Sequence, residues 1–313
     1  MVTPAFPETG RTVYQGHLFV GAVPLDESPL KDHPLNPMHD ANLVRVLGRQ
    51  SSSRVGLVRL ATVVEGADAI RAQLLALASS GVRSGIVDAV FDRDLEAIGV
   101  AALDRNLSVG ASGLGRGLAK GLMSAGKVRP ARADAVASER PIGGPIVCLA
   151  GSCSQATLTQ VAAAKSIMPT LQLDPEALVA GSTGVDDALR WASERLAKGA
   201  ILIASSAPPD AVAALQARHG REVAGHAIEE AMAKIAVGLV DRGVRRLVVA
   251  GGETSGAVVD ELSIRAFLVG QEIAPGVPVL RTVGDKTRDM IFALKSGNFG
   301  GVDFFADALK LIA

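Results

Sequence analysis

The sequence predicts an α/β protein of two domains, in which mainly parallel sheets are flanked by helices. At 313 residues and 48% hydrophobic composition, the chain can bury a large core and is long enough for about two domains. Short apolar segments alternate with single helical segments, a pattern typical of parallel βαβ units. Small, polar and basic residues from Lys120 to Arg140 separate two such regions and suit an interdomain linker.

Composition excludes several classes of function. The 32 basic and 32 acidic side chains balance, so no net field draws the chain to nucleic acid or to an acidic membrane. Aromatic residues make up only 3% of the chain, which argues against platforms that stack nucleobases. Cys148 and Cys153 are too few for a disulfide scaffold, match no zinc spacing and fit a reduced cytosol. We expect a cytoplasmic protein with no signal peptide and no membrane span.

The first region begins irregularly and then alternates. Prolines interrupt the first fifty residues, of which only 12–14 and 18–20 are expected to be extended. After them we expect strands and helices in turn, with strands at 54–60 and 83–90, helices at 66–79 and 92–103, and a glycine loop at 112–118 that leads into a helix.

The second region repeats this alternation. Apolar runs at 145–150, 200–204 and 245–250 predict buried strands. Helical periodicity predicts helices at 154–166 and 226–242. The order of these segments again indicates parallel strands joined by helices.

The most informative segment follows the last of these strands. Gly251 and Gly252 end the strand abruptly and open a helix of small residues. Glycine lets a backbone approach a ligand closely, and the free N–H groups of a first helical turn attract anions. Thr254 and Ser255 add hydroxyl donors, and Glu253 adds a carboxylate that could hold Mg²⁺ or orient water. The segment therefore predicts a phosphate site, with an ordinary strand-to-helix turn as the alternative.

Two further loops of small residues have similar chemistry. Gly151–Ser154 follows a strand and opens a helix, and the segment 293–301 combines Lys295 with hydroxyl and amide donors. Lys295 could neutralise charge on a transferring phosphoryl group. None of the three loops has the Walker pattern or the dinucleotide fingerprint. Because loops after the carboxyl ends of parallel strands meet at one edge of an open sheet, we expect the three to lie together.

Other residues with reactive side chains give weaker signals. Cys153 lies at an expected helix N-terminus, which could lower its thiol pKa, but no histidine is near it in sequence and we interpret it as a small structural residue. Asp285 and Lys286 could position a phosphoryl group, although a surface turn is the favoured interpretation.

Histidines and aspartates gather in the irregular start. They are His17, His33, His39, Asp32 and Asp40. Their spacing matches no known metal geometry, so exposure to solvent or contact with a substrate is favoured over metal binding. We therefore name no metal site.

The separated motifs together resemble the four-carbon acid sugar kinase family. The likeness lies in the loops at 151–155, 251–256 and 294–300. The segments 6–20 and 33–38 are similar to the branch of that family that acts on 3-oxo-tetronate. The resemblance extends over essentially the whole chain. It implies ATP-dependent phosphorylation of the terminal hydroxyl of this sugar acid to the 4-phosphate, with D-threonate or D-erythronate as alternative substrates.

The resemblance also implies a division of labour. Residues 1–138 would hold the sugar acid and the linker, and residues 139–313 would bind the nucleotide. The matching motifs place ATP at Ser152, Gly251, Gly252, Glu253, Thr254 and Gly297, with Mg²⁺ as the second cofactor. The implied partner is a small sugar acid rather than nucleic acid or membrane, and a homo-oligomer is compatible with this interpretation.

One family motif does not occur in the sequence. Family members open with a strand and an Ala-Asp-Asp-Phe-Thr-Gly-Ala segment that supplies acidic groups to the substrate. We therefore expect the first domain to be incomplete and to contribute only its C-terminal portion, and we name no catalytic base. Weak activity, or an inactive protein that binds only nucleotide or sugar acid, is the resulting alternative.

Overall fold

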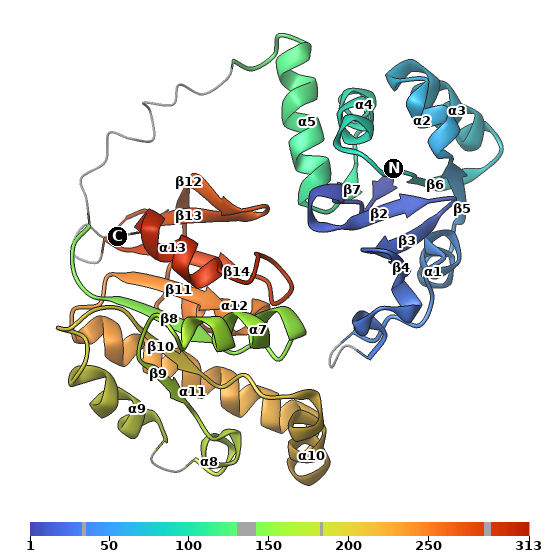
Figure 1. Ribbon diagram of the computed structural model, residues 1–313. Helices are drawn as coiled ribbons and strands as arrows, with labels where there is room; N and C mark the ends of the chain where they lie inside the picture. Colours follow the sequence, from blue (N-terminus) through green and yellow to red (C-terminus); the bar gives the residue numbers. More distant parts are fainter. Residues whose placement is uncertain (33–35, 130–141, 182–183, 285–288, 313) are drawn as a thin grey trace. The chain divides into compact units, whose positions relative to one another are not determined.

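The computed structural model describes residues 1–32, 36–129, 142–181, 184–284 and 289–312. The chain divides into two compact units, Met1–Ala135 and Val136–Ala313. Each unit has its own central sheet and its own buried apolar residues (Figure 1). Both units are α/β, as the sequence predicts.

A parallel sheet of four strands forms the centre of the first unit, in the order β5-β6-β1-β7. Its strands are β1 (Val2–Thr3), β5 (Arg54–Val58), β6 (Val82–Val87) and β7 (Val109–Gly110). The helices between and after them are α2 (Leu60–Val64), α3 (Ala67–Ser79), α4 (Asp92–Ala102) and α5 (Ser112–Ser124). Side chains such as Val58, Ile70, Ile86 and Ile98 fill the core between sheet and helices.

The start of the chain is more regular than its prolines suggest. A small antiparallel sheet contains β2 (Arg11–Tyr14), β3 (His17–Val20) and β4 (Val23–Pro24). Around it lie the 3₁₀ turns η1 (Pro7–Thr9), η2 (Leu25–Glu27) and η3 (Pro29–Asp32), and the helix α1 (Leu43–Gln50). Pro7 and Pro29 stand at the first position of a turn, where a missing N–H costs no hydrogen bond. The prediction of an irregular start was therefore wrong for β1 and α1.

The glycine segment at 112–118 is helical, not the loop that the sequence predicts. Its glycines allow α5 to pack directly on α4: a Cβ on Gly99 would overlap the carbonyl oxygen of Gly117, and a Cβ on Gly117 would overlap that of Leu95. Close packing between the two helices compensates for the low helix propensity of glycine. The expected linker also begins later than Lys120, because α5 continues to Ser124.

A sheet of seven strands forms the second unit, in the order β12-β13-β14-β11-β8-β10-β9. Five strands are parallel: β8 (Ile146–Ala150), β9 (Thr170–Gln172), β10 (Ile201–Ala204), β11 (Arg246–Ala250) and β14 (Ile291–Lys295). The predicted strands at 145–150, 200–204 and 245–250 are confirmed to within one residue. An antiparallel hairpin of β12 (Phe267–Ala274) and β13 (Val277–Thr282) extends the sheet.

Helices cover both faces of this sheet (Figure 1). One face packs against α7 (Gln155–Ala164) and α13 (Phe304–Ile312). The other packs against α8 (Pro175–Val179), α9 (Gly184–Ser193), α11 (Arg221–Asp241) and α12 (Gly252–Glu261). Helix α10 (Pro209–His219) precedes α11, which begins five residues before the predicted His226.

The strand order of the second unit changes direction between β8 and β11. From β8 the chain adds β9 and β10 on one side, and then β11 and β14 on the other. Loops that leave the carboxyl ends of two such strands diverge toward opposite faces of the sheet. They leave a crevice in which open α/β sheets bind ligands.

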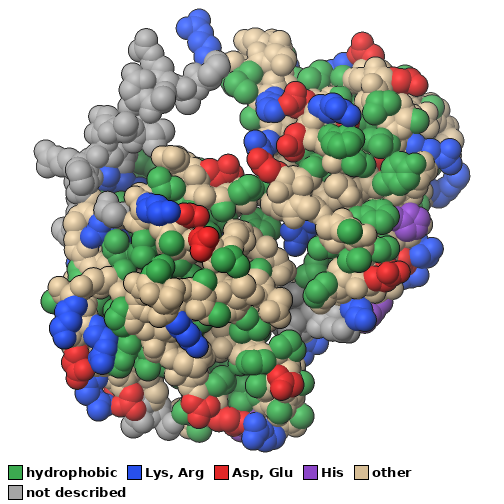
Figure 2. All heavy atoms as spheres, in the orientation of Figure 1, with side chains coloured by type: hydrophobic (Ala, Val, Ile, Leu, Met, Phe, Trp, Pro, Cys, Tyr) green, Lys and Arg blue, Asp and Glu red, His purple; other side chains and the backbone are tan. Residues whose placement is uncertain are grey.

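Charge and hydropathy on the outside agree with the balanced composition. In both units, the face drawn in Figure 2 carries interspersed positive and negative side chains. Among the residues that the structure describes, no helix combines the length and apolar character that crossing a membrane requires.

Candidate functional site

The three predicted loops begin at one edge of the large sheet. Ala250 at the end of β11 pairs with Ala150 of β8 on one side and with Lys295 of β14 on the other. The next residues along the chain are Gly151, Gly251 and Ser296. The three loops therefore leave neighbouring strands at the same level.

Backbone hydrogen bonds connect these loops. The N–H groups of Gly151 and Ser152 donate to the Ala250 carbonyl at 2.9 and 3.2 Å. The Gly251 N–H donates to the Lys295 carbonyl at 2.9 Å. The loops that begin at Gly151 and Gly251 are therefore each bonded to the end of the adjacent strand, so the sheet itself holds them in place.

Two glycines allow side chains of adjacent loops to approach the backbone. A Cβ on Gly151 would overlap Thr254 Oγ1, and a Cβ on Gly297 would overlap Ser152 Oγ. Thr254 is buried and lies at the junction of the first two loops. The structure thus brings Ser152, Thr254 and Gly297 together.

Gly251 and Gly252 are not equivalent. Gly251 has φ +137°, and a Cβ there would lie 3.0 Å from both Ser152 N and Thr254 Oγ1. A Cβ on Gly252, the first residue of α12, would meet nothing within 4 Å. The strand-to-helix turn therefore requires glycine at Gly251.

The edge presents several hydrogen-bond donors. Ser255 N donates to the Gly251 carbonyl at 2.9 Å, the first bond of α12, so helix geometry leaves the amides of Gly252, Glu253 and Thr254 without an intrahelical acceptor. Ser152 Oγ accepts from Ser154 N at 3.2 Å, which leaves its own proton for another acceptor. Such amides and hydroxyls suit an anion.

Lys295 does not extend into the third loop. It is the last residue of β14, its side chain is 1% exposed, and burial lowers the pKa of its ammonium to about 8. Its Nζ donates to Thr157 Oγ1 at 3.0 Å and to the Ser296 and Gly297 carbonyls at 3.1 and 2.8 Å. The position of Lys295 therefore does not support the expectation that it contacts a transferring phosphoryl group, because Thr157 and the carbonyls of the third loop already accept hydrogen bonds from its ammonium.

Two carboxylates lie near the start of α12. Glu253 is exposed at the second position of the helix. Partial burial raises the pKa of Glu229 on α11, and the negative charge of Glu253 raises it further. Sequence reasoning missed Glu229, because nothing in the pattern of α11 distinguishes it from other acidic residues on a solvated face.

Cys153 has the structural character that we expected. Burial raises the pKa of its thiol, which disfavours the reactive thiolate. Its Sγ accepts from Ala207 N at 3.5 Å, in a loop after β10 that sequence reasoning missed. The hydroxyls of Ser205 and Ser206 in that loop are buried, and within the described residues they have no hydrogen-bond partner. Two serines directly after a predicted strand were the available signal.

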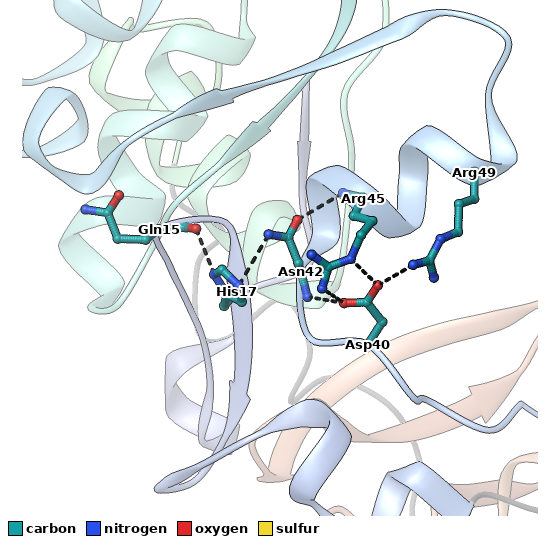
Figure 3. Close-up of polar contacts among 6 residues, drawn as sticks. All are labelled: Gln15, His17, Asp40, Asn42, Arg45 and Arg49. Carbon is teal, nitrogen blue, oxygen red and sulfur yellow. Dashed lines mark hydrogen bonds and ion pairs between the residues drawn. The ribbon is translucent and has the colours of Figure 1, made fainter.

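Two of the histidines and aspartates of the first unit, His17 and Asp40, have structural partners (Figure 3). His17 Nδ1 lies 2.9 Å from the Gln15 carbonyl and its Nε2 lies 3.3 Å from Asn42 Nδ2. Asp40 binds the guanidinium of Arg45 and that of Arg49, which holds the pKa of its carboxyl at about 2. These contacts attach the β2–β3 hairpin to the start of α1.

The remaining candidates are placed only in part. His39 is exposed. His33, Asp285 and Lys286 lie outside the described residues, as does the side chain of Asp32. Within the described ranges, no three His, Cys, Asp or Glu residues are grouped so that they could hold a metal ion.

Asp88, which sequence reasoning missed, follows a strand of the four-stranded parallel sheet in the first unit. Its buried carboxylate follows β6 and accepts from the N–H groups of Gln15, Gly16 and Leu60 at 2.9, 2.9 and 3.0 Å. Burial raises its pKa, while these three bonds act in the opposite direction. Asp88 thus connects the hairpin turn to the start of α2.

Comparison with known proteins assigns both units. Residues 1–118 match the model of a sugar-binding N-terminal domain, and residues 147–305 match that of a nucleotide-binding C-terminal domain. The chain belongs to the four-carbon acid sugar kinase family. The loops at Gly151, Gly251 and Ser296 all lie within the kinase family's nucleotide-binding domain.

Curated relatives and solved structures agree with this family. The 3-oxo-tetronate kinase of Methylobacterium radiotolerans is 66% identical over all of this chain and 73% of its own length. That of Cupriavidus necator is 50% identical over 98% of this chain and 70% of its own length. A crystal structure from Salmonella typhimurium LT2 matches with a TM-score of 0.78 and 37% identity, over 99% of this chain and 72% of that one. One from Haemophilus influenzae matches with a TM-score of 0.67 and 39% identity, over 100% and 74%.

Proposed function

We propose that this protein is an ATP-dependent kinase that phosphorylates the terminal hydroxyl of 3-oxo-tetronate and gives 3-oxo-tetronate 4-phosphate. The observation that carries the proposal is the meeting of three donor-rich loops at the ends of β8, β11 and β14. The names of the relatives from Methylobacterium radiotolerans and Cupriavidus necator support the choice of substrate.

The nucleotide would occupy the edge formed by these loops. The amides of Gly252 and Glu253 and the hydroxyl of Ser152 would donate to phosphate oxygens. Helix geometry leaves the two amides without an intrahelical acceptor, and Ser152 Oγ accepts one hydrogen bond while its own proton is left for another acceptor. Thr254 and Gly297 would shape the floor of the site, where the backbone approaches closely. Such fixed donors stabilise developing charge without having to reorganise during phosphoryl transfer.

Magnesium would accompany ATP at this site. Mg²⁺ prefers oxygen ligands and is commonly held by one or two carboxylates together with substrate phosphates. The exposed carboxylate of Glu253, with Glu229 near it, offers this chemistry at the start of α12. The ion would neutralise phosphate charge, and the two glutamates would orient it directly or through water.

An assay of ADP release tests this function. The purified chain is incubated with ATP, Mg²⁺ and one sugar acid at a time: 3-oxo-tetronate, D-threonate or D-erythronate. We expect the highest kcat/KM with 3-oxo-tetronate. A preference for one of the reduced acids would change the assigned substrate and keep the kinase. A folded chain that binds ATP but releases ADP with none of the acids would instead be a non-catalytic binding protein.

A further inference from the structure

The ammonium of Lys295 is buried among neutral partners. Its three hydrogen-bond partners are the Thr157 hydroxyl and two carbonyls of the third loop, and the ring of Phe304 lies 5.6 Å from Nζ. No carboxylate of the described chain forms an ion pair with it. Burying a charge without a counter-ion costs free energy. A lysine at this buried position is therefore not explained by packing alone.

Three side chains converge on one carbonyl. The Gly297 oxygen accepts from Lys295 Nζ at 2.8 Å, from Ser154 Oγ at 2.8 Å and from Thr157 Oγ1 at 2.9 Å. Ser154 is the N-cap residue of α7 and Thr157 lies in its first turn, whereas Lys295 ends β14. The carbonyl is therefore fixed toward the interior of the unit, between the first and third loops.

The geometry of the peptide bond sets the direction of the adjacent donor. In a trans peptide the C=O and the following N–H point in opposite directions. Because the Gly297 carbonyl points inward, the N–H of Asn298 points outward. Asn298 is exposed, and within the described residues its N–H donates to no acceptor. Gly297 itself packs against Ser152 of the first loop.

We propose that Lys295 is a positioning residue of the nucleotide site: with Ser154 and Thr157 it fixes the Gly297–Asn298 peptide, so that the Asn298 N–H donates to a phosphate oxygen. The inference rests on the proposed function. The positive charge of Lys295, which no carboxylate of the described chain neutralises, adds attraction for the same anion.

Variants at Thr157 and Lys295 test the proposal in the full chain. Thr157→Val removes the hydroxyl but keeps the shape, and Thr157→Ser keeps the hydroxyl as a matched control. We expect Thr157→Val to raise the Kd for ATP about tenfold, the factor expected for one lost hydrogen bond to a fixed group, and Thr157→Ser to stay near the parent. Lys295→Met should raise it roughly thirtyfold, whereas Lys165→Met at an exposed position of the same unit should have no effect.

Two further measurements separate positioning from a purely structural role. KM for the sugar acid should stay at the parental value in Thr157→Val. The backbone ¹⁵N–¹H resonance of Asn298 should shift when ATP or inorganic pyrophosphate is added to the parent, and shift less in Thr157→Val. If Lys295→Met does not fold, the pair of Thr157 variants still decides.

The outcomes distinguish this inference from the proposed function. Suppose that the parent binds ATP, that Thr157→Val binds it with the parental Kd, and that ATP does not shift the Asn298 resonance. The inference is then wrong, and the proposed kinase function stands. If the parent binds no ATP but the Asn298 resonance responds to pyrophosphate and loses the response in Thr157→Val, the anion donor stands and the kinase does not. A parent that responds to neither probe overturns both.

Discussion

Single residues at the sheet edge have requirements that the sequence does not reveal. The pair Gly251-Gly252 was a correct signal for a turn, but only the structure shows that the positive φ belongs to Gly251. Lys295 was correctly linked to the third loop, but its expected contact with a transferring phosphoryl group is not supported, because it belongs to β14 and its side chain turns inward. Periodicity predicts which residues form a strand and does not say what its last side chain touches.

Alanine at the two glycines should separate these requirements. Gly251→Ala should lower the free energy of unfolding by about 2 kcal/mol or more, since φ +137° strains a residue that carries a Cβ. Gly252→Ala is the matched control and should change it by less than about 0.5 kcal/mol, because its Cβ would lie in open space at the start of a helix. Urea denaturation of both variants measures the difference. A loss for Gly251→Ala as small as that expected for Gly252→Ala would show that the turn does not require glycine at this position.

Lys295 should give the stability a specific pH dependence. Its pKa is about 8 in the folded chain, below its ordinary value of 10.5. Between these two values the unfolded state holds more protons at this residue, so its contribution to the free energy of unfolding rises with pH. We expect the stability of the parent relative to Lys295→Met to rise from pH 8 to pH 10 and to be flat between pH 6 and 7. A difference that falls or does not change over the upper range would contradict the buried ammonium.

Elements were predictable where apolar runs or helical periodicity were strong. Two of the three strands that carry the loops, β8 and β11, were identified nearly to the residue, because they are buried on both faces. The third, β14, was missed, because its last residues were interpreted as part of the loop at 293–301. The hairpin β12–β13 was missed, since half of β12 is exposed and β13 is only partly buried, so neither strand forms a continuous apolar run. The glycine segment in α5 was mistaken for a loop because contact with α4, not local propensity, stabilises that helix.

The α4–α5 contact gives a prediction at this scale. Gly99→Ala should lower the free energy of unfolding by about 2 kcal/mol or more, because its Cβ would overlap the Gly117 carbonyl and force the helices apart. Gly115→Ala on α5 is the control: its Cβ would meet nothing, so alanine should stabilise the helix by up to about 1 kcal/mol. Thermal unfolding of both variants decides, and a stabilising effect of Gly99→Ala would disprove the close contact.

At the scale of the whole molecule, the two units have separate cores. Among the described residues, those that fill the core of the second unit all belong to that unit. All three loops of the candidate nucleotide site also lie in this unit. Composition, the linker and the alternation of strands and helices were enough to predict two α/β domains. The contacts between the three loops depend on how the strands pair in the sheet, and the sequence pattern does not specify that pairing.

A fragment that begins at residue 142 should therefore fold alone and bind the nucleotide. We expect ATP with Mg²⁺ to raise its melting temperature, since a ligand that binds only the native state stabilises it. AMP, which lacks the outer phosphates, serves as the control and should have a smaller effect. A fragment with a cooperative transition that ATP does not shift would place the nucleotide elsewhere.

We propose that the loops after β8, β11 and β14 hold the nucleotide. Calorimetric titration of the full chain with ATP and Mg²⁺ tests it most directly, with Gly297→Ala and Gly301→Ala as a matched pair. A Cβ on Gly297 would overlap Ser152 Oγ, whereas one on Gly301 would meet nothing. We expect one saturable site in the parent and in Gly301→Ala, and an affinity lower by a factor of about ten or more in Gly297→Ala. Absence of binding by the folded parent, or equal affinity in all three proteins, would contradict it.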